Sequence, residues 1–363
     1  MKLMILKDTF LKALQMVQPV ISAHPVKSIM ANVLIRAEGN QVYFTATDDT
    51  VTLRYRVEAE VVEEGASTFA ARRLLNVVRE LPESTVSFSV DDKDVASIRC
   101  GSSSSKLYGI PSDDFPVMES MEGMLDFTMD QAALKQMIQN TAYAASGEEN
   151  RQVLNGVLMS FREQKAVVVA TDGRRLALME QEIEVPAGKG VEMIVPTKTV
   201  GEWVRVLQDE GTVKVQASDR MVGIVLSDLV IVSKLIEGTY PNFRQVIPNR
   251  CEERVSLSRE GLLAALRRVS AITDHGVSVK MAFQDNELKI TSQAPDVGEA
   301  EETLPVKYTG KGVTIAFNPD FLMDPLRNLV CDEIYFELVD NLNPGVIKCD
   351  IPFLYVIMPQ RLV

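Results

Sequence analysis

One arrangement of residues occurs three times along this chain of 363 residues. A short strand followed by an amphipathic helix is predicted from Met4 (MILKDTFLKALQMV), from Leu125 (LDFTMDQAALKQMIQ) and from Val255 (VSLSREGLLAALRRV). In each copy, two apolar residues three positions apart, such as Leu11 and Leu14 in the first, fall on one face of the predicted helix. A repeat of roughly 120 residues is far longer than the unit of a solenoid or a propeller, so we expect each copy to be a whole domain.

A second pattern, strand–helix–strand, follows in each copy and begins at Ser67, Met193 and Thr314. Between the two helical segments apolar and polar residues alternate, as in VYFTATDDTVTLRYRVE from Val42, which is typical of half-buried strands. The sequence therefore predicts an α+β fold of three tandem copies of one domain, in which two helices pack on antiparallel sheets. We place the three domains at residues 1–120, 125–248 and 250–363.

The phrase Ser-Lys-Leu occurs at Ser105 and again at Ser233, and each time a turn with Pro and Phe follows it. We interpret both phrases as the beginning of the last strand of copies one and two. The Pro/Phe turn then leads into the linker to the next copy.

Basic residues occupy equivalent positions on the predicted helices, although the chain as a whole is acidic. The formal net charge of −12 argues by itself against binding to nucleic acid, because affinity for phosphates comes from clustered Lys and Arg. Arg79, Arg205 and Arg327 nevertheless fall on the same repeat position, as do Arg72 and Lys198. Two interpretations stand: ordinary solvated helix faces, which Lys and Arg suit well, or a basic track for a phosphate backbone.

The four cysteines, Cys100, Cys251, Cys331 and Cys349, form no CxxC pair and no metal-like cluster in the sequence. We therefore expect reduced thiols in a cytosolic protein, and neither a metal nor an organic cofactor. The N-terminal segment MKLMILKDTF contains charges and no long apolar run, and no stretch approaches the roughly 20 apolar residues of a membrane span. These features predict a cytoplasmic protein that has no membrane partner.

A metabolic enzyme is the alternative class, favoured by the acidic composition and by Asp-rich turns such as ATDDT and SDDFP. Against it, the chain has only two histidines, His24 and His275, and no GxGxxG, P-loop or HExxH motif. The cysteines stand in no catalytic signature. A passive structural module would explain the repeat, but not the basic residues at repeat-equivalent positions.

Three motifs, in order on a triplicated chain, point to one family. VVVATDGRRLAL in the middle copy, GTYPNFRQVIP at its end and the terminal YVIMPQRLV resemble the bacterial β sliding clamp of the replicative DNA polymerase. The resemblance covers residues 1–363 and implies a head-to-tail homodimer, a ring of six domains whose helices line a hole for duplex DNA. It also implies a processivity factor that has no catalytic activity of its own. The implied partners are the polymerase catalytic subunit, the clamp loader, and other polymerases and repair proteins that carry short clamp-binding peptides.

By this resemblance, basic helix faces and the loop SAHPVKS contact phosphates without reading base sequence. Taken alone, that loop is equally well a plain polar loop. At the implied dimer interface, an edge strand over 104–108 pairs near the third-domain helix that ends at Ile272, with Ser105, Leu107 and Ile272 as interface residues. The implied DNA-binding residues are His24, Lys27, Arg72, Arg73, Arg79, Lys135, Lys198, Arg205, Arg267 and Arg327.

The resemblance further implies a hydrophobic cleft between the second and third domains, which binds partner peptides with a Gln and a Leu/Phe tail. Arg174, Gln245 and Phe321 stand where the family often has His, Arg and Tyr, and the loop over 273–278 is shorter than in well-known members, so the rim of the cleft differs from the common pattern. The implied cleft residues are Arg151, Leu154, Thr171, Gly173, Arg174, Arg175, Leu176, Pro241, Val246, Asn318, Phe321, Leu342, Pro344, Val356, Met358, Pro359, Arg361 and Leu362.

Overall fold

The chain forms two compact units in the computed structural model, which describes all residues except 23, 26, 122–124, 149, 185–189, 249–252, 275 and 362–363. Unit 1 contains residues 1–131 and 201–235, and unit 2 contains residues 132–200 and 236–363. The predicted second domain, 125–248, therefore contributes strands to both units.

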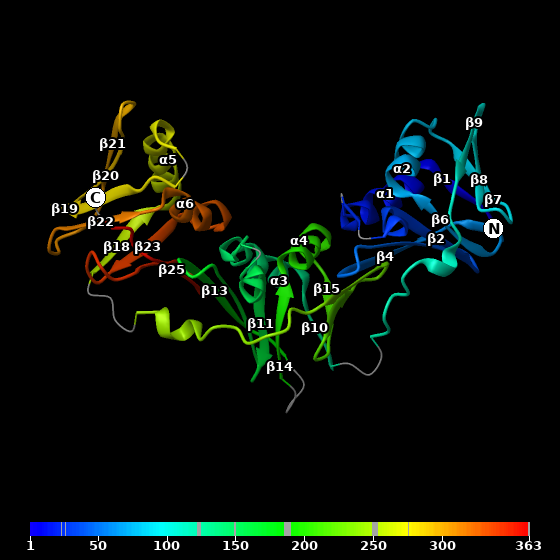
Figure 1. Cartoon of the computed structure of the whole chain (residues 1–363). Coiled ribbons are helices and arrows are strands. Elements are labelled where there is room, and N and C mark those ends of the chain that lie inside the picture. The colour runs from blue at the N-terminus through cyan, green and yellow to red at the C-terminus, as the bar shows by residue number, and fades with distance from the viewer. Residues whose placement is uncertain are drawn as a thin grey trace. The chain divides into compact units, whose positions relative to one another are not determined.

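Unit 1 contains two antiparallel sheets (Figure 1). The larger has eight strands in the order β10-β15-β16-β17-β4-β3-β2-β6, and the smaller has five in the order β5-β1-β7-β8-β9. The bounds are β1 Lys2–Leu6, β2 Asn32–Glu38, β3 Gln41–Thr47, β4 Val51–Glu58, β5 Glu60–Glu63, β6 Gly65–Ala70, β7 Thr85–Val90, β8 Val95–Cys100, β9 Ser103–Tyr108, β10 Leu125–Asp130, β15 Thr212–Ala217, β16 Met221–Val225 and β17 Leu229–Lys234.

Two helices, α1 (Lys7–Val17) and α2 (Ala71–Arg79), pack against each other in unit 1, and α1 also contacts β3 and β4 (Figure 1). Phe10 of α1 is 1% exposed and its ring lies 5.6 Å from Phe44 and 5.5 Å from Phe88. Aromatic pairs at this separation add to the free energy that their burial supplies. The apolar face predicted for the first helix thus forms the core between α1 and the sheets.

Unit 2 also contains an eight-stranded sheet, in the order β14-β11-β12-β13-β25-β24-β23-β18, and a four-stranded sheet in the order β21-β20-β19-β22. Its helices α5 (Arg259–Val269) and α6 (Pro319–Asn328) contact each other. Ser258 caps α5 by accepting a hydrogen bond from the Gly261 amide at 3.2 Å, which satisfies one of the free donors of the first turn. The strand bounds are β11 Gly156–Arg162, β12 Lys165–Thr171, β13 Arg175–Glu182, β14 Val191–Pro196, β18 Glu253–Ser258, β19 Val279–Gln284, β20 Glu287–Ala294, β21 Gly298–Pro305, β22 Val313–Phe317, β23 Glu333–Leu338, β24 Gly345–Lys348 and β25 Phe353–Ile357.

The helices α3 (Gln131–Gln139) and α4 (Thr197–Val206) belong to the predicted second domain. The helix pairs α1 and α2, α3 and α4, and α5 and α6 therefore follow the predicted repeat, and the predicted α+β class with antiparallel sheets is confirmed. Short 3-10 helices lie at η1 Gln18–Val20, η2 Ser28–Ala31, η3 Ser112–Asp114, η4 Ala142–Ala144, η5 Gln152–Asn155, η6 Phe243–Val246 and η7 Ser270–Ile272.

Each eight-stranded sheet contains one junction at which strands of two predicted domains pair. In unit 1, β17 of the second domain pairs antiparallel with β4 of the first, and Leu229 lies opposite Tyr55. In unit 2, β25 of the third domain pairs antiparallel with β13 of the second, and Phe353 lies opposite Met179. The strand order around the two junctions is the same. In the described part of the chain, β9 and β21, which hold the remaining equivalent positions, are sheet edges.

The prediction that Ser105 and Ser233 begin the last strands of their copies is wrong. Ser105 is the third residue of β9, which starts directly after a tight turn at Gly101, where φ is +57°. Ser233 is the second-last residue of β17, because the apolar run from Leu229 has already formed the ladder with β16 and β4. The phrase therefore does not mark the same place in the two strands: Tyr108 and Lys234 each lie opposite the first residue of the neighbouring strand, so Ser105 corresponds to Ile231.

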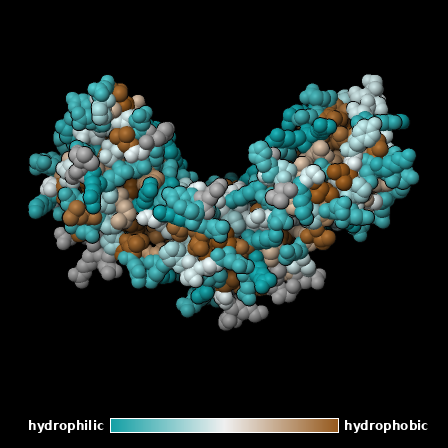
Figure 2. All heavy atoms as spheres, viewed as in Figure 1, coloured by the Kyte–Doolittle hydropathy of each residue, from teal (hydrophilic) through white to brown (hydrophobic). Residues whose placement is uncertain are grey.

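Hydrophilic side chains cover most of the surface in the view of Figure 2, and hydrophobic ones form small separate patches. Over the described residues, no helix is long and apolar enough to cross a membrane.

Candidate functional site

The predicted Thr-Asp-Gly turn joins β12 to β13 in unit 2 and is held by its own side chains. One oxygen of the Asp172 carboxylate accepts hydrogen bonds from the amides of Arg174 at 2.8 Å and Arg175 at 3.0 Å. The Thr171 hydroxyl donates to the carbonyl of Arg175 at 2.6 Å. Gly173 has φ +87°, a conformation that glycine adopts without steric cost. The turn thus presents backbone, and no side chain, at Gly173.

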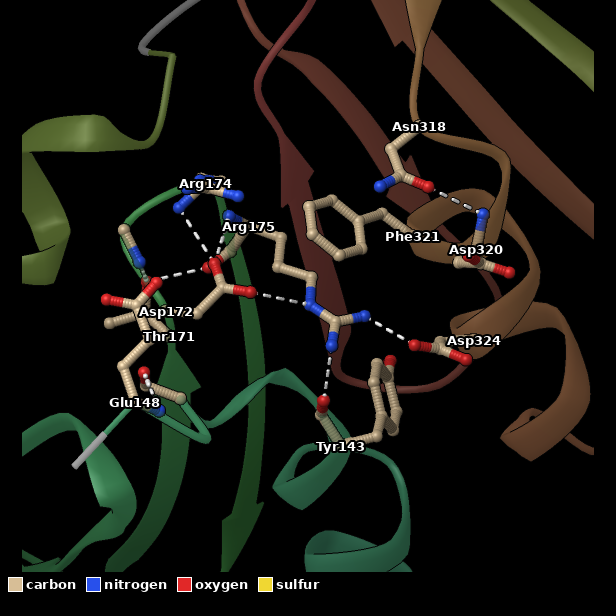
Figure 3. Close-up of polar contacts among 12 residues, drawn as sticks. Tyr143, Glu148, Thr171, Asp172, Arg174, Arg175, Asn318, Asp320, Phe321 and Asp324 are labelled. Atoms are coloured by element: carbon tan, nitrogen blue, oxygen red, sulfur yellow. Dashed lines mark hydrogen bonds and ion pairs between the residues drawn. The ribbon is translucent and has the colours of Figure 1, made fainter. Parts of the chain in front are cut away.

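Arg175, the first residue of β13, connects this turn to helix α6 (Figure 3). Its guanidinium donates to Asp172 at 3.1 Å and to Asp324 of α6, and it donates to the carbonyl of Tyr143 at 2.7 Å. It also lies over the ring of Phe321, 4.3 Å from the ring centre. The side chain is only 10% exposed, so the two carboxylates compensate the cost of burying its charge.

Burial alone would lower the pKa of Arg175, but Tyr355, Asp324 and Asp172 raise that pKa above its ordinary value. The guanidinium therefore stays charged. Burial also raises the pKa of Tyr143 well above its ordinary value. The Tyr143 hydroxyl is buried and has no hydrogen-bond partner among the described residues. Arg175 is therefore a fixed, charged support beneath the predicted cleft.

An apolar layer covers the outer side of the same sheet, next to the turn. Tyr240 is part of this layer, and its hydroxyl accepts a hydrogen bond from the Thr171 amide at 3.1 Å. A cavity of about 260 Å³ is lined by Leu178, Phe243 and Ile247 together with Arg244, Glu180 and residues 352–354. The buried members of the layer are Leu158, Val167, Val169, Leu176, Leu178, Ile194, Tyr240 and Val356, and Val153, Leu154, Ile236, Phe243, Ile247 and Leu354 pack against them.

Several apolar residues of the predicted cleft are exposed. Val246 is 48%, Leu342 80% and Met358 42% exposed. Exposed apolar side chains close to an apolar layer are typical of a surface that binds a partner. The Met358 amide donates to the Arg174 carbonyl at 2.9 Å, and the Gln360 amide donates to the Ala316 carbonyl at 2.8 Å. These two bonds hold the chain end beside the turn.

The other described residues of the predicted cleft also belong to unit 2. Arg151 donates to the carbonyl of Asp172 at 2.9 Å and pairs with Glu148 at 3.1 Å. Asn318 caps α6 by accepting from the Asp320 amide at 2.9 Å (Figure 3). Leu176 and Val356 are buried in the layer, whereas Leu342 is in the turn between β23 and β24. Of the rest, Pro241, Arg174 and Arg361 are exposed, Pro344 and Pro359 are half-buried, and Leu362 lies outside the described residues.

Sequence reasoning missed residues that contact the predicted cleft residues. Asp324 holds Arg175 across 149 positions of sequence, and no local pattern signals that contact. Tyr240 and Phe243 stand within the quoted motif GTYPNFRQVIP but were not assigned to the cleft. Their aromatic side chains next to Pro241 were the one signal that could have identified them.

The predicted DNA-binding arginines of α2 face solvent. Arg72, Arg73 and Arg79 are exposed, while Leu74 and Val78 of the same helix are fully buried. In the described part of the structure, none of the three guanidiniums has an ion-pair partner. The helix therefore separates an apolar face toward the core from a basic face toward solvent, as the sequence predicts.

Two other predicted DNA-binding arginines have hydrogen-bond or ion-pair partners within the protein. Arg205 donates to the Met16 carbonyl at 2.8 Å and pairs with Glu202 at 2.7 Å. Arg327 pairs with Asp324 at 3.2 Å. Carboxylates therefore partly neutralise two of the three repeat-equivalent arginines. Arg267, Lys198, His24 and Lys27 are exposed and Lys135 is half-buried.

The predicted dimer residues lie at the two sheet edges or close to them. In β9, Ser105 and Leu107 are half-buried, and the side chains between and after them, at Lys106 and Tyr108, are exposed. The helix expected to end at Ile272 ends at Val269, and Ile272 closes the following 3-10 helix η7.

Comparisons with known proteins identify relatives along the whole chain. Models of the N-terminal, central and C-terminal domains of the DNA polymerase III beta subunit match residues 1–119, 128–242 and 244–361. The beta sliding clamp of Chlamydia muridarum is 34% identical over 363 residues, which cover 100% of this chain and 99% of that protein.

Solved structures agree with these matches. The DNA polymerase III subunit beta of Pseudomonas aeruginosa (30% identity) has a TM-score of 0.95 over 100% of both chains. A DnaN sliding clamp of Bartonella birtlesii bound to griselimycin (32% identity) also has a TM-score of 0.95 over 100% of both chains. The predicted series of three tandem domains of one family is thereby confirmed.

Proposed function

This chain belongs to the bacterial beta sliding clamp family, the beta subunits of DNA polymerase III, and we propose that it closes into a ring around duplex DNA and tethers replication proteins there. As a DNA sliding clamp, it acts in DNA replication. The proposal includes that the chain catalyses no reaction and that its partners are the polymerase catalytic subunit, the clamp loader, and other polymerases and repair proteins.

The strand pairing supports a head-to-tail homodimer. The last strand of one domain pairs with the fourth strand, in chain order, of the preceding domain. This pairing occurs between β17 and β4 and again between β25 and β13. The equivalent strands left over are β9 of the first domain and β21 of the third. If β9 of one copy pairs with β21 of a second copy, the same junction forms twice more and the ring closes.

Side-chain charges favour that pairing. β21 carries Glu299, which has no ion-pair partner among the described residues, together with Glu301 and Glu302, which pair with Lys289 and Arg268, and β9 carries Lys106. The repeated glutamates discourage β21 of one copy from pairing with β21 of another copy, because like charges would then face each other. Charged side chains protect sheet edges in this way in many proteins. In this proposal Ser105, Leu107 and Ile272 lie at the interface between copies.

The basic faces of the helices support non-specific contact with DNA. Arginines such as Arg72, Arg73 and Arg79 point into solvent from a rigid helix and can contact phosphates without reading bases. Such contacts are weakened by salt and are indifferent to sequence, which permits sliding.

The apolar layer beside the Thr-Asp-Gly turn supports a peptide site. We propose that it takes the Leu/Phe tail of a short clamp-binding peptide. Val246 and Met358 are exposed, and they stand next to Ile247 and two residues after Val356, which both belong to the layer. A few such contacts normally carry most of the affinity for a short peptide.

The repeated junction with its two unused edges is the observation that carries the proposal. The test is to load the protein with a clamp loader onto nicked circular DNA and then to linearise the DNA. A ring stays on the circle at high salt and is lost from the free ends after cutting. Equal retention on circular and linear DNA, or a monomer by sedimentation at micromolar concentration, would contradict the proposal.

A further inference from the structure

The outer face of the first domain's sheet has a different chemistry from its equivalent in the second domain. Strand register defines the equivalent positions: Arg54 lies opposite Thr45, Leu178 opposite Val169, and Glu301 opposite Thr291. One fold position therefore carries a basic, an apolar and an acidic side chain in the three domains. Leu178, the apolar residue at this position, is part of the proposed peptide site. The face that carries Arg54 is therefore a candidate for a second binding site.

Two arginines and a tyrosine form the centre of this face, called here the arginine patch (Arg36, Tyr43 and Arg54). Tyr43 of β3 lies opposite Arg36 of β2, and the Arg54 guanidinium is 5.8 Å from the centre of the Tyr43 ring. Both arginines are exposed. Within the described residues, neither guanidinium has an ion-pair or hydrogen-bond partner. By contrast, the adjacent Arg56 is bound by Asp228 at 2.6 Å.

The patch is one wall of a cavity of about 460 Å³. The segment after β9 forms the other wall with Asp113, Phe115, Pro116, Val117 and Met118. Phe115 is buried against Ile29 and Met30 and fixes the segment, while Val117 is 90% exposed. The cavity therefore combines the two guanidiniums with two carboxylates, Glu38 and Asp113, and with an exposed apolar side chain.

The patch is on the side of the sheet that faces away from α1. Phe44 and Leu53, the neighbours of Tyr43 and Arg54 along their strands, are buried toward the core on which α1 packs. Because successive side chains of a strand point to opposite faces, Arg36 and Arg54 point away from α1. They therefore do not belong to the basic helix faces that the proposed function assigns to DNA.

We propose that the arginine patch is a second docking site, which binds an acidic peptide segment that carries a carboxylate next to an apolar side chain. The proposal rests on the proposed function only in that the segment belongs to a protein held on the clamp. Arginine suits planar carboxylates because its donors form a fixed fork. A phosphate backbone fits less well, because Glu38 and Asp113 line the same cavity and would repel a continuous row of phosphates, whereas a single carboxylate needs only the two guanidiniums.

The experiment is a calorimetric titration of the full-length protein with the peptide Asp-Leu-Glu-Phe-Asp, the charge-reversed peptide Lys-Leu-Lys-Phe-Lys, and a single-stranded oligonucleotide. The test variant is Arg36→Ser with Arg54→Leu, which installs the residues of the second domain, Ser160 and Leu178, at the same positions. The control is Lys2→Ser with Arg220→Ser, which removes two exposed charges elsewhere in unit 1.

We expect the acidic peptide to bind, its affinity to fall at least tenfold in the test variant, and the control to change it less than twofold. No binding of the acidic peptide, equal affinity in the test variant, or tighter binding of the oligonucleotide would overturn the proposal. Binding of a Gln-Leu-x-Leu-Phe peptide and retention on circular DNA are measured on the same variants. They report on the proposed function separately, and we expect neither to change.

Discussion

The two junctions between domains share a backbone and differ in side chains. In both, a Thr-Asp turn precedes the paired strand, and the Asp carboxylate accepts from two amides: Asp48 in the first junction and Asp172 in the second. The third residue has positive φ in each, +78° at Asp49 and +87° at Gly173. The same turn therefore occurs twice, and the second turn adjoins the apolar layer that is proposed to bind a peptide.

The differences are concentrated at three equivalent positions. In the first junction, Asp49 forms an ion pair with Lys234 at 3.1 Å across the turn. In the second, the corresponding residues are Gly173 and Met358, which cannot form such an ion pair, and the Arg151 guanidinium lies 3.3 Å from the position that a Cβ of residue 173 would take. Below the turn, the buried Val51 of the first junction is replaced by Arg175, which binds Asp172 and Asp324. Pairing of the strands therefore needs neither Gly173 and Met358 nor the buried arginine.

The largest effect is expected for Arg175→Val, which places the residue of the first junction in the second. The substitution leaves Asp172 and Asp324 without their common cation and removes the stack on Phe321, and breaking a buried ion pair in this way costs roughly 3 kcal/mol. Native-state hydrogen exchange of the β13 and β25 amides measures the free energy of local opening. The matched control is Arg174→Val at the exposed neighbouring position. Equal losses in the two variants would show that the buried contacts of Arg175 do not stabilise the junction.

A smaller effect, on binding, is expected for Gly173→Asp combined with Met358→Lys, which rebuilds the ion pair of the first junction over the apolar layer. An Asp side chain is accepted at this φ, as Asp49 demonstrates. Affinity for a Gln-Leu-x-Leu-Phe peptide should fall at least tenfold, or about 1.4 kcal/mol, when it is titrated against the variant.

The reciprocal variant, Asp49→Gly with Lys234→Met, is the control and should leave the affinity unchanged. Unaltered binding by the variant with Gly173→Asp and Met358→Lys would show that the surface at these two residues is not part of the peptide site.

The smallest effect is expected on contact with DNA. Arg79→Ser should lower the slope of log affinity against log salt for a short duplex by about 0.9, the loss of one phosphate contact. Arg205→Ser should lower it less, because the Arg205 guanidinium already binds Glu202 and the Met16 carbonyl. The order of the two slopes decides the issue: a larger change for Arg205 would mean that its internal contacts are given up on DNA.

The sequence predicts those features that depend on residues close together along the chain. The triplication, the helices and the half-buried strands follow from periodicity, and the turn at Thr171 follows from residues adjacent in sequence. The pairing of β17 with β4 could not be predicted, because an open strand edge does not specify its partner. The contact of Arg175 with Asp324 depends on the same long-range packing.

Some structural information was present in the sequence but not used. Arg205 follows Glu202 by three positions, and Arg327 follows Asp324 by three, a spacing at which side chains on a helix meet. That spacing predicts partial neutralisation of both arginines. The cleft residues themselves came from the resemblance, since Gly173 or Met358 alone would indicate only a turn and a chain end.

Hydrogen exchange of the full-length protein, with and without saturating Gln-Leu-x-Leu-Phe peptide, tests most directly whether this peptide binds at the second junction and not at the first. We expect slower exchange at the described amides within residues 171–176, 242–247 and 356–361, and no change within 47–53 and 229–234. Protection at the first junction, or at neither junction, would contradict the account.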